Sequence, residues 1–421
     1  MSKIKISKPQ WVLLLVILAI LTAGTLDCFV SSNPAGDWMM YIRASRLYQD
    51  EMPIYNVLIQ QLKHFQYFLY SPTFVFLLVP VSFLPIFLSL ALWHILKIIL
   101  LLRVFKIIFP YLDYQSLSEK KKALILFGTA LFSIRFLLYD FDLGQLTLFL
   151  LWTMVEAWNQ LNKQKLMIPT LLLAFGVFAK MLSVIFIPYL IYKRKFKALV
   201  YMLLWVVFLA FLPFIFGGWD YQMALLKQWL GIILPFASVN GSYNAIPHGL
   251  HDVFNAVPAW YAWLQSNLAF PTLDAGQLKI IAYLIILTFG AGFIYISSIK
   301  PVKDRNKNAI CEIAYLLGCI PIIFPYQHKY SYVLMLPAII YLMHQLVSGN
   351  MKIFGKVLIA IAFLLMVAST DGLIGHRLND ITQEYKYVTL GGILLIICLA
   401  FGNNSASVSA NPESFRNIGM E

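Results

Sequence analysis

The sequence is poor in charged residues, which make up 12% of its 421 positions, whereas hydrophobic residues make up 60%. A soluble globular domain typically carries roughly 25% charged residues, about twice this share. The mean hydropathy of +0.76 points in the same direction. The apolar residues also lack the strand-like alternation between turns that a membrane β-barrel shows. The composition therefore argues against a soluble protein and predicts an all-α polytopic membrane protein.

Cysteine is also scarce, and its positions show no pairing pattern. The four residues are Cys28, Cys311, Cys319 and Cys398. Each lies in or beside an apolar segment, and no two have the spacing of a CxxC pair or a zinc site. We expect small core residues at these positions, and neither a metal ion nor an organic cofactor.

Acidic residues are outnumbered by basic ones, which gives the chain a net charge of +13. In a soluble protein such an excess would indicate a nucleic-acid partner. In a membrane protein, Lys and Arg collect in cytoplasmic loops and near anionic headgroups. We therefore expect membrane lipids, and no nucleic acid, beside these basic residues.

Long apolar stretches are present at residues 11–30, 85–104, 199–216 and 280–299. Each approaches the roughly 20 residues that a membrane-spanning helix needs. The first follows Lys3, Lys5 and Lys8, an arrangement that signal peptides share. This run is longer than a usual signal-peptide core and no clear cleavage site follows it. An uncleaved first helix is therefore favoured over a signal peptide.

Basic segments set the orientation of the chain because positively charged loops stay in the cytoplasm. They lie at residues 3–8, 120–122, 163–165, 193–197, 300–307 and 352–356. Placing them all on one side requires about 12 crossings, with both termini in the cytoplasm. Residues 1–402 then form a single membrane domain, and the polar residues 403–421 form a disordered cytoplasmic tail.

The chain must turn on the outer side between these basic segments. The expected outer segments are residues 31–71, 139–142, 217–277, 325–330 and 371–386. Between Lys165 and Lys193 there is room only for two short helices or a re-entrant hairpin, with Lys180 near its outer tip. Short helices at membrane depth are tolerated only inside the protein or beside a wet cavity.

Charged residues from separate parts of the chain map to this outer side. They are Asp37, Asp140, Asp142, Lys180, His328 and Lys329. Outer loops need polar residues in any case, which is one explanation of each single position. The set favours a functional site, because a charge at membrane depth normally faces an interior site or water. Arg135 falls deep in a short helix, where it could pair with Asp140 or Asp142.

The first outer loop contains an amphipathic helical pattern at residues 36–48, with Trp38, Tyr41 and Tyr48 as interface aromatics. Asp37 lies at or near the N-cap of this expected helix. Two interpretations stay open for it. The carboxylate could only cap the helix. It could instead be a general base at the membrane surface, which a helix N-terminus would help to keep ionised.

A series of short motifs follows Asp37 in order along the chain. They are Pro53-x-Tyr55, Tyr70-x-Pro72 with Pro80 and Pro85, Gly144-Gln145, Ala179-Lys180 with Pro188, and Phe324-Pro325 with His328 and Leu336-Pro337. Together, over residues 37–337, they resemble glycosyltransferase family 87 of the GT-C superfamily. The chain departs from the family at Glu51-Met52, where a Gly is usual, and around His328, where Ser and Trp are common. These departures concern the acceptor and the sugar more than the fold.

The resemblance implies a GT-C type fold and an inverting transferase that acts outside the cytoplasm. It would move a hexose, typically mannose, from a polyprenyl-phosphate sugar to a lipid or glycan acceptor. Asp37 would be the base that deprotonates the acceptor hydroxyl. The basic residues available to the donor phosphate are Arg43, Lys180, His328 and Lys329. The expected substrate-binding residues are Tyr41, Asp140, Asp142, Gln145 and Asn244.

The long outer segment, residues 217–277, is rich in aromatic and amide side chains. Trp219, Trp229, Trp260 and Trp263 could stack on sugar rings, and Asn240 to Asn244 could bind hydroxyls. An interfacial aromatic belt is the favoured interpretation. Asp140 and Asp142 have the spacing of an Asp-x-Asp metal motif, but one such tripeptide is weak evidence for a divalent ion.

Other membrane functions stay open beside a glycosyltransferase. A transporter or lipid flippase would use intramembrane charges, yet the chain shows no convincing internal repeat. An O-antigen polymerase or ligase would also have many helices and a large outer loop, but the motif order around Asp37 argues against it. The expected location is a bacterial inner membrane, with the site on the periplasmic side. The sequence does not identify the acceptor.

Overall fold

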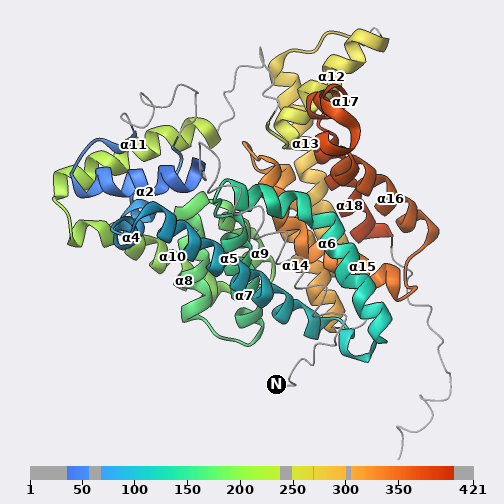
Figure 1. The fold of residues 1–421 in the computed structure, drawn as a ribbon, viewed down its shortest axis with the longest axis horizontal. Coiled ribbons are helices and arrows are strands. Elements are labelled where there is room, and N and C mark those ends of the chain that lie inside the picture. Colours follow the sequence, from blue (N-terminus) through green and yellow to red (C-terminus); the bar gives the residue numbers. More distant parts are fainter. Residues whose placement is uncertain (1–35, 56–67, 238–248, 269, 300–304, 403–421) are drawn as a thin grey trace, which may run out of the picture.

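The computed structural model describes residues 36–55, 68–237, 249–268, 270–299 and 305–402. The first apolar stretch, Cys28, Asn244 and the polar tail are predictions that lie outside these residues. Within the described residues every regular element is helical, and strand-like pairing is limited to isolated bridge positions such as the one between Leu250 and His328. The all-α prediction is therefore confirmed for this part of the chain (Figure 1).

The α-helices of the described residues follow one another along the chain. They are α2 (Gly36–Gln49), α4 (Pro72–Ser82), α5 (Ile86–Ile108), α6 (Glu119–Asp142), α7 (Thr147–Asn162), α8 (Met167–Lys180), α9 (Phe186–Tyr192), α10 (Phe196–Phe211), α11 (Trp219–Ala237), α12 (Val253–Leu268), α13 (Ala275–Ile294), α14 (Arg305–Ile323), α15 (Leu336–Val347), α16 (Ile353–Phe363), α17 (Asp371–Glu384) and α18 (Tyr387–Phe401).

Long apolar helices confirm that the protein spans a membrane. Among the described residues, 5 helices are long and apolar enough to cross a bilayer, or up to 6 if a bent pair counts as one span. They include the segments predicted at 85–104, 199–216 and 280–299, which lie in α5, α10 and α13. The bent pair joins Ile353–Ala368 to Asp371–Glu384 at 92°. The predicted count of about 12 crossings is not confirmed.

Several predicted details of the spans are confirmed. Cys311, Cys319 and Cys398 are buried and free. The segment between Lys165 and Lys193 forms two short helical pieces, α8 and Leu182–Tyr192. Met181 separates them with a φ of 56°, a left-handed conformation that ends α8 directly after Lys180. Lys180 therefore lies at the turn, as the sequence indicated.

Other segments predicted as outer loops are more helical than expected. The segment at 217–277 contains α11 and α12, and the segment at 371–386 contains α17. The turn expected at residues 139–142 lies just beyond them, because α6 continues through Asp142. Gly144 takes a φ of 64°, and its N–H bonds the carbonyl of Phe141, so the glycine ends the helix instead.

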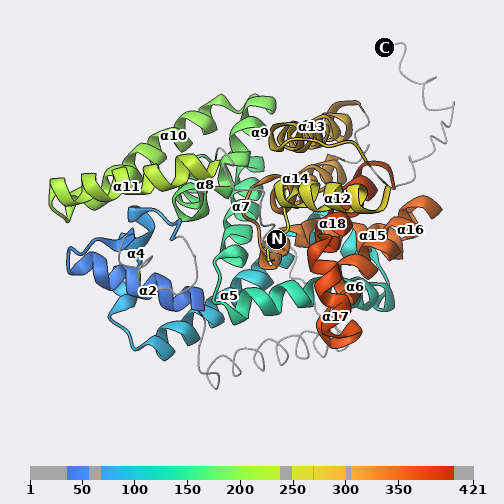
Figure 2. The same ribbon diagram turned by 90° about the horizontal axis from the view of Figure 1, so that it is seen from above.

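The expected amphipathic helix is present as α2, which packs beside α4 and α11 in a layer at one edge of the molecule (Figures 1 and 2). Trp38, Tyr41 and Tyr48 are all buried on its inner face. Gln222 of α11 donates a hydrogen bond to the Tyr48 hydroxyl at 2.6 Å. Trp229 of α11 reaches the carbonyl of Leu69 at 3.0 Å. The first contact joins α11 to α2, and the second joins α11 to the segment that precedes α4.

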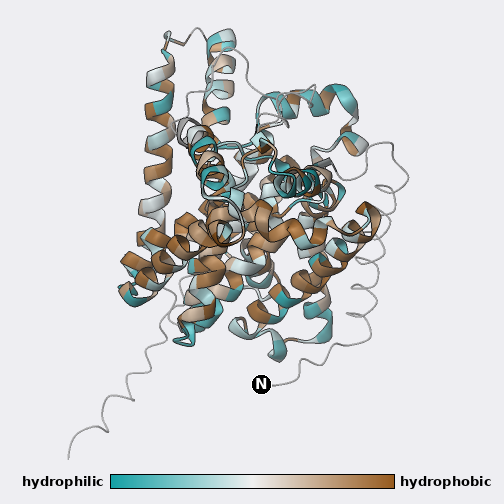
Figure 3. Cartoon of the chain, turned by 90° about the vertical axis from the view of Figure 1, so that its left-hand side faces the viewer, coloured by the Kyte–Doolittle hydropathy of each residue, from teal (hydrophilic) through white to brown (hydrophobic). Residues whose placement is uncertain are grey.

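The molecule has two polar ends with a hydrophobic middle (Figure 3). Helices α5, α6 and α7 all meet near the α6–α7 turn, where Trp93 and His94 of α5 bond the carbonyls of Gly144 and Phe141. At the other end of the same helices, Arg103 of α5 bonds Glu156 of α7. We call the first the turn end and the second the ion-pair end. Basic segments 120–122 and 193–197 lie at the ion-pair end, because Lys122 is near the start of α6 and Lys195 Nζ bonds the carbonyl of Leu161 near the end of α7.

Candidate active site

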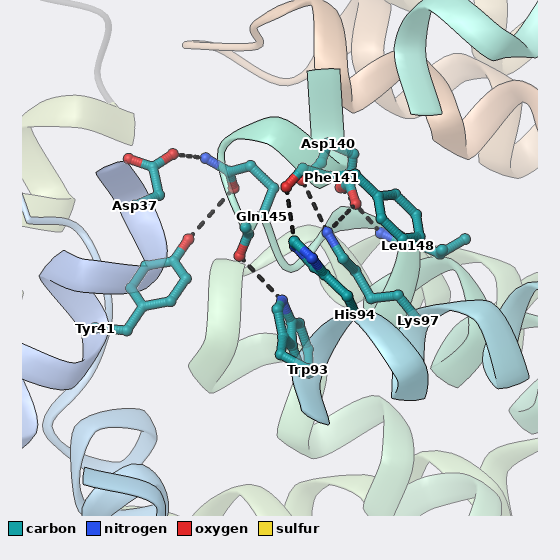
Figure 4. Close-up of polar contacts among 10 residues, drawn as sticks. Asp37, Tyr41, Trp93, His94, Lys97, Asp140, Phe141, Gln145 and Leu148 are labelled. Atoms are coloured by element: carbon teal, nitrogen blue, oxygen red, sulfur yellow. Dashed lines mark hydrogen bonds and ion pairs between the residues drawn. The ribbon is translucent and has the colours of Figure 1, made fainter. Parts of the chain in front are cut away.

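The candidate site begins where the first turn of α2 meets the α6–α7 turn. Asp37 is half-buried there, and Gln145 is almost fully buried. The Gln145 side-chain amide, through Nε2, donates a hydrogen bond to Asp37 Oδ2 (Figure 4). The structure thus brings together two residues that the sequence placed in one site, although they are far apart along the chain.

Tyr41 extends this contact into a chain of hydrogen bonds. Its hydroxyl donates to Gln145 Oε1 at 3.3 Å and lies 2.5 Å from the hydroxyl of Tyr70. Tyr41 and Tyr70 also meet edge to face, with ring centroids 4.7 Å apart. Tyr41 follows Asp37 by one helical turn, so both side chains project from the same face of α2. The predicted grouping of Asp37, Tyr41 and Gln145 is therefore present in the structure.

Asp140 lies beneath this group but makes a different contact from the one expected. Its Oδ1 accepts a hydrogen bond from Lys97 Nζ at 3.0 Å, and both side chains are 0% exposed. Lys97 also donates to the Asp140 carbonyl at 2.9 Å. The sequence did not single out Lys97. A lysine within an apolar stretch is usually interpreted as one whose ammonium group extends to the membrane surface. The buried pair makes Asp140 part of the support of the site.

A cation faces this group from the end of α8. Lys180 Nζ lies over the ring of Tyr330, 4.4 Å from its centroid, and donates to the Tyr330 hydroxyl at 3.4 Å. Tyr330 in turn stacks with Tyr139 of α6, with centroids 5.9 Å apart. The charge of Lys180 is thus held by an aromatic ring and a hydroxyl, which bind it without neutralising it.

The charges of this site act on one another. Burial raises the pKa of Asp37 to about 6, since a carboxylate is less stable away from water. Lys180 opposes this rise by attraction, and the negative charge of Asp140 adds to it. Asp37 is therefore ionised at neutral pH and is a stronger base than an exposed aspartate. A pKa near the working pH is what general-base catalysis needs.

His328 lies next to this group, in the loop before the helical turn at Lys329–Met335. Its ring centroid is 5.5 Å from that of Tyr330. Burial and the nearby Lys180 lower the pKa of His328 to about 4. The imidazole is therefore neutral at physiological pH. It would contribute to an anion site as an N–H donor rather than as a cation.

A second polar cluster, which the sequence did not predict, holds the His328 loop in place. Asp252 is fully buried and accepts hydrogen bonds from the backbone of Gln327 and from Asn255, at distances of 2.9 to 3.2 Å. His251 bonds Gln383 of α17 at 3.0 Å. The Asp–x–x–Asn spacing before α12 is an N-cap pattern, and it is the signal that marks Asp252 in the sequence.

The other candidates are spread around the site. Lys329 is half-buried and lies within electrostatic range of Arg135 and Lys386. Arg135 does not pair with Asp140 or Asp142 as expected; it donates to the carbonyl of Met366 at 2.7 Å and to Ser369 Oγ at 3.1 Å. Arg43 and Asp142 are exposed, and the structure does not bring them to Asp37. Asn244 lies outside the described residues.

The aspartates at 140 and 142 do not share a site, because one is buried against Lys97 and the other is exposed. Among the described residues, no group of three His, Cys, Asp or Glu side chains gathers closely enough to hold a metal ion. The arrangement instead offers one ionised base, a cation and neutral hydrogen-bond donors. Such a set can deprotonate a hydroxyl and stabilise a departing anion.

A comparison with protein families gives one match. The family model of glycosyltransferase family 87 matches residues 68–325, more than half of the chain. Lys97, Asp140, Gln145 and Lys180 lie within the matched range, whereas Asp37 and His328 lie outside it. A comparison with curated proteins finds no match.

Proposed function

The chain belongs to glycosyltransferase family 87, and from this premise we propose that it transfers a hexose, mannose in the first instance, from a polyprenyl-phosphate sugar to a hydroxyl of a lipid or glycan acceptor. The protein is a membrane glycosyltransferase. The proposal adds the donor, the side of the membrane and the roles of the residues, on a GT-C type fold.

The two polar ends support an extracytoplasmic site. Basic segments lie at the ion-pair end, and positively charged loops stay in the cytoplasm. Asp37 and Lys180 lie at the turn end, opposite to it. A donor with a polyprenyl chain is dissolved in the bilayer, so it would reach this end from the lipid. In a bacterial cell this side is the periplasmic face of the inner membrane.

The proposed reaction is a single displacement with inversion at the anomeric carbon. The acceptor hydroxyl gives its proton to Asp37 while its oxygen attacks the anomeric carbon of the donor sugar. The bond between that carbon and the phosphate oxygen breaks, and the electron pair leaves with the polyprenyl phosphate. Lys180 and His328 would stabilise the growing negative charge of this leaving group. Lys329 lies next to His328 and would add a second cation.

The observation that carries the proposal is that Asp37 and Lys180, which have opposite charges, each bind an uncharged partner. Asp37 accepts from an amide, and Lys180 donates to a tyrosine hydroxyl. They interact electrostatically without appearing as an ion pair among the described residues. A base and a cation that do not pair with each other can each act on a substrate whose reacting oxygen atoms need one of each.

The test is sugar transfer by the purified protein in liposomes that contain a polyprenyl-phosphate sugar and membrane lipid extract. Asp37→Asn keeps the shape of the side chain and removes the base, so we expect transfer to fall by roughly 10²-fold or more. Asp220→Asn is the matched control, because Asp220 also lies in the first turn of a helix and is exposed. Full activity of Asp37→Asn would exclude the base. Substrate movement without transfer would favour a transporter.

A further inference from the structure

Gln145 links Asp37 to the rest of the site, because the nitrogen and the oxygen of its side-chain amide have different partners. The amide nitrogen donates to Asp37 Oδ2, and the amide oxygen accepts from the Tyr41 hydroxyl (Figure 4). A carboxylate only accepts hydrogen bonds, so the direction of the first contact is fixed. The bond occupies Oδ2, and within the part of the chain that the structure describes no hydrogen bond is made to Oδ1, so we assign Oδ1 to the incoming proton.

The backbone of Gln145 is fixed by the turn that precedes it. Its N–H bonds the carbonyl of Asp140 at 2.9 Å. Gly144, with its φ of 64°, turns the chain so that the Gln145 side chain points at α2, a conformation that favours glycine. The Gly144 carbonyl accepts the indole N–H of Trp93 at 3.1 Å. The turn is therefore held by a hydrogen bond within itself and by one from α5.

The Lys97–Asp140 ion pair lies at the centre of this turn. Lys97 binds both the carbonyl and the Oδ1 of Asp140, and the other carboxylate oxygen accepts the backbone N–H of Leu148 at 3.4 Å. One residue thus joins α5, the end of α6 and the start of α7. Each side chain is 0% exposed, so the pair is shielded from competing water and from salt.

The same turn also holds the backbone that carries the base. The N–H of Trp38 bonds the carbonyl of Leu143 at 3.3 Å. The Trp38 ring stacks on Trp93 of α5, with centroids 4.9 Å apart and an interplanar angle of 12°. Its indole N–H bonds Ser89 Oγ at 3.1 Å. Asp37 is therefore held twice by one turn, through its neighbour's backbone and through its own carboxylate.

We propose that Gln145, fixed by the buried Lys97–Asp140 pair, is a positioning residue that binds Asp37 Oδ2, directs Oδ1 toward the acceptor hydroxyl and keeps the carboxylate ionised. This inference rests on the proposed role of Asp37 as base. In this proposal the α6–α7 turn aligns the base. The turn lies within the residues that match the family model, whereas Asp37 lies outside them.

The test is the pH dependence of sugar transfer by Gln145→Leu. Loss of a hydrogen bond to the charged form favours the protonated form. We therefore expect the acid side of the rate profile to move up by about one pH unit. At high pH, kcat should fall by roughly 10-fold because the base is less well aligned. KM for the donor should change little.

Gln160→Leu is the matched control. Gln160 also donates from its amide to a carboxylate, Glu156 Oε1 at 2.9 Å, but does so at the ion-pair end. This variant should keep the wild-type pH profile and kcat. Gln145→Leu could reduce the yield of folded protein, so the decisive quantity is the ratio of rates at two pH values, which does not depend on the folded fraction. Tyr41→Phe removes the donor to Gln145 Oε1 and should shift the profile less, in the same direction.

The outcomes separate the inference from the proposed function. If wild-type protein transfers sugar, Asp37→Asn does not, and Gln145→Leu keeps the wild-type pH profile, the positioning role is wrong and the base stands. If Gln145→Leu and Gln160→Leu shift the profile equally, the effect is not specific to Asp37 and the inference also fails. If wild-type protein transfers no sugar, the proposed function itself fails.

Discussion

Charged side chains have different partners at the two polar ends of the molecule. At the ion-pair end, Arg103 meets Glu156 at 3.0 Å and Lys193 meets Glu312 at 2.7 Å. At the turn end, Asp37 and Lys180 are bound by an amide and a tyrosine instead. Charges that neutralise each other stabilise a structure, whereas charges with neutral partners can still interact with a ligand. This difference supports the proposal that the turn end acts on the substrate.

Exchanging a carboxylate for an amide at each end tests this comparison most directly. Asp37→Asn should abolish most transfer, by roughly 10²-fold or more, while the free energy of unfolding changes by less than about 1 kcal/mol. Glu312→Gln should lower the free energy of unfolding by about 1–3 kcal/mol, with little loss of kcat. Thermal unfolding in detergent and transfer assays give both quantities. Equal loss of activity in the two variants would contradict the division.

The Lys97–Asp140 pair differs from Asp37 and Lys180 at the turn end, because it is both neutralised and buried. Lys97→Met leaves a buried carboxylate without its cation and should cost about 3–5 kcal/mol of stability. The double variant Lys97→Met/Asp140→Asn removes both charges and should recover most of that loss. Chemical unfolding of the two proteins measures the difference. A double variant as unstable as the single one would show that the charges themselves are not coupled.

Lys180 provides a test on the cationic side of the turn end. Lys180→Gln removes the charge and should lower kcat by about 10²-fold, as loss of one donor to a developing anion does. Lys180→Arg keeps the charge and should retain more of the rate. The measurement is single-turnover transfer from the lipid-linked donor. If the two variants lose the same rate, the charge of Lys180 does not act on the leaving group.

The pH dependence of the wild-type rate follows from the raised pKa of Asp37, about 6. Only the ionised form accepts a proton, so transfer should fall as the pH drops through 6, by about 10-fold between pH 7 and pH 5. His328, with a pKa near 4, stays neutral over this range and should not contribute. Asp37→Asn should lose this acid limb in its residual rate; a limb that survives belongs to another group.

The smallest effect is expected from an ion pair of the ion-pair end whose cation is exposed. Arg103 is 41% exposed in its contact with Glu156. Arg103→Gln should change stability by less than about 1 kcal/mol and leave transfer unchanged. High salt should reduce the difference between this variant and wild type. A large loss of transfer would give the ion-pair end a role in catalysis and weaken the comparison.

Local patterns predicted much of the fold and the core of the site. The apolar stretches gave α5, α10 and α13, and the aromatic spacing after residue 36 gave α2. Placing the basic segments on one side led to Asp37 and Lys180 as members of one outer set, and the family resemblance added Gln145. The helix predictions are confirmed because helix periodicity depends on neighbouring residues, whereas the roles of the site residues stay predictions.

The contacts that support the site could not be predicted in this way. Lys97 and Asp140 lie 43 residues apart, and His251 and Gln383 lie 132 apart. Each pair depends on how helices pack, which the pattern of a single segment does not contain. Arg135 shows the same limit. A nearby carboxylate was the expected partner by charge, but packing places the guanidinium against the carbonyl of Met366, 231 residues further along.

The Arg135 contact has a consequence for how the chain is inserted into the membrane. Met366 and Ser369 lie at the 92° corner between Ile353–Ala368 and Asp371–Glu384. A ribosome makes Arg135 long before it makes this corner. Until then α6 carries a guanidinium at membrane depth without its carbonyl partner, which is costly in lipid. Once Met366 and Ser369 are inserted, they bind the guanidinium and end that exposure. A chain truncated before Met366 should therefore be recognised as incomplete and degraded faster than one truncated after Thr370.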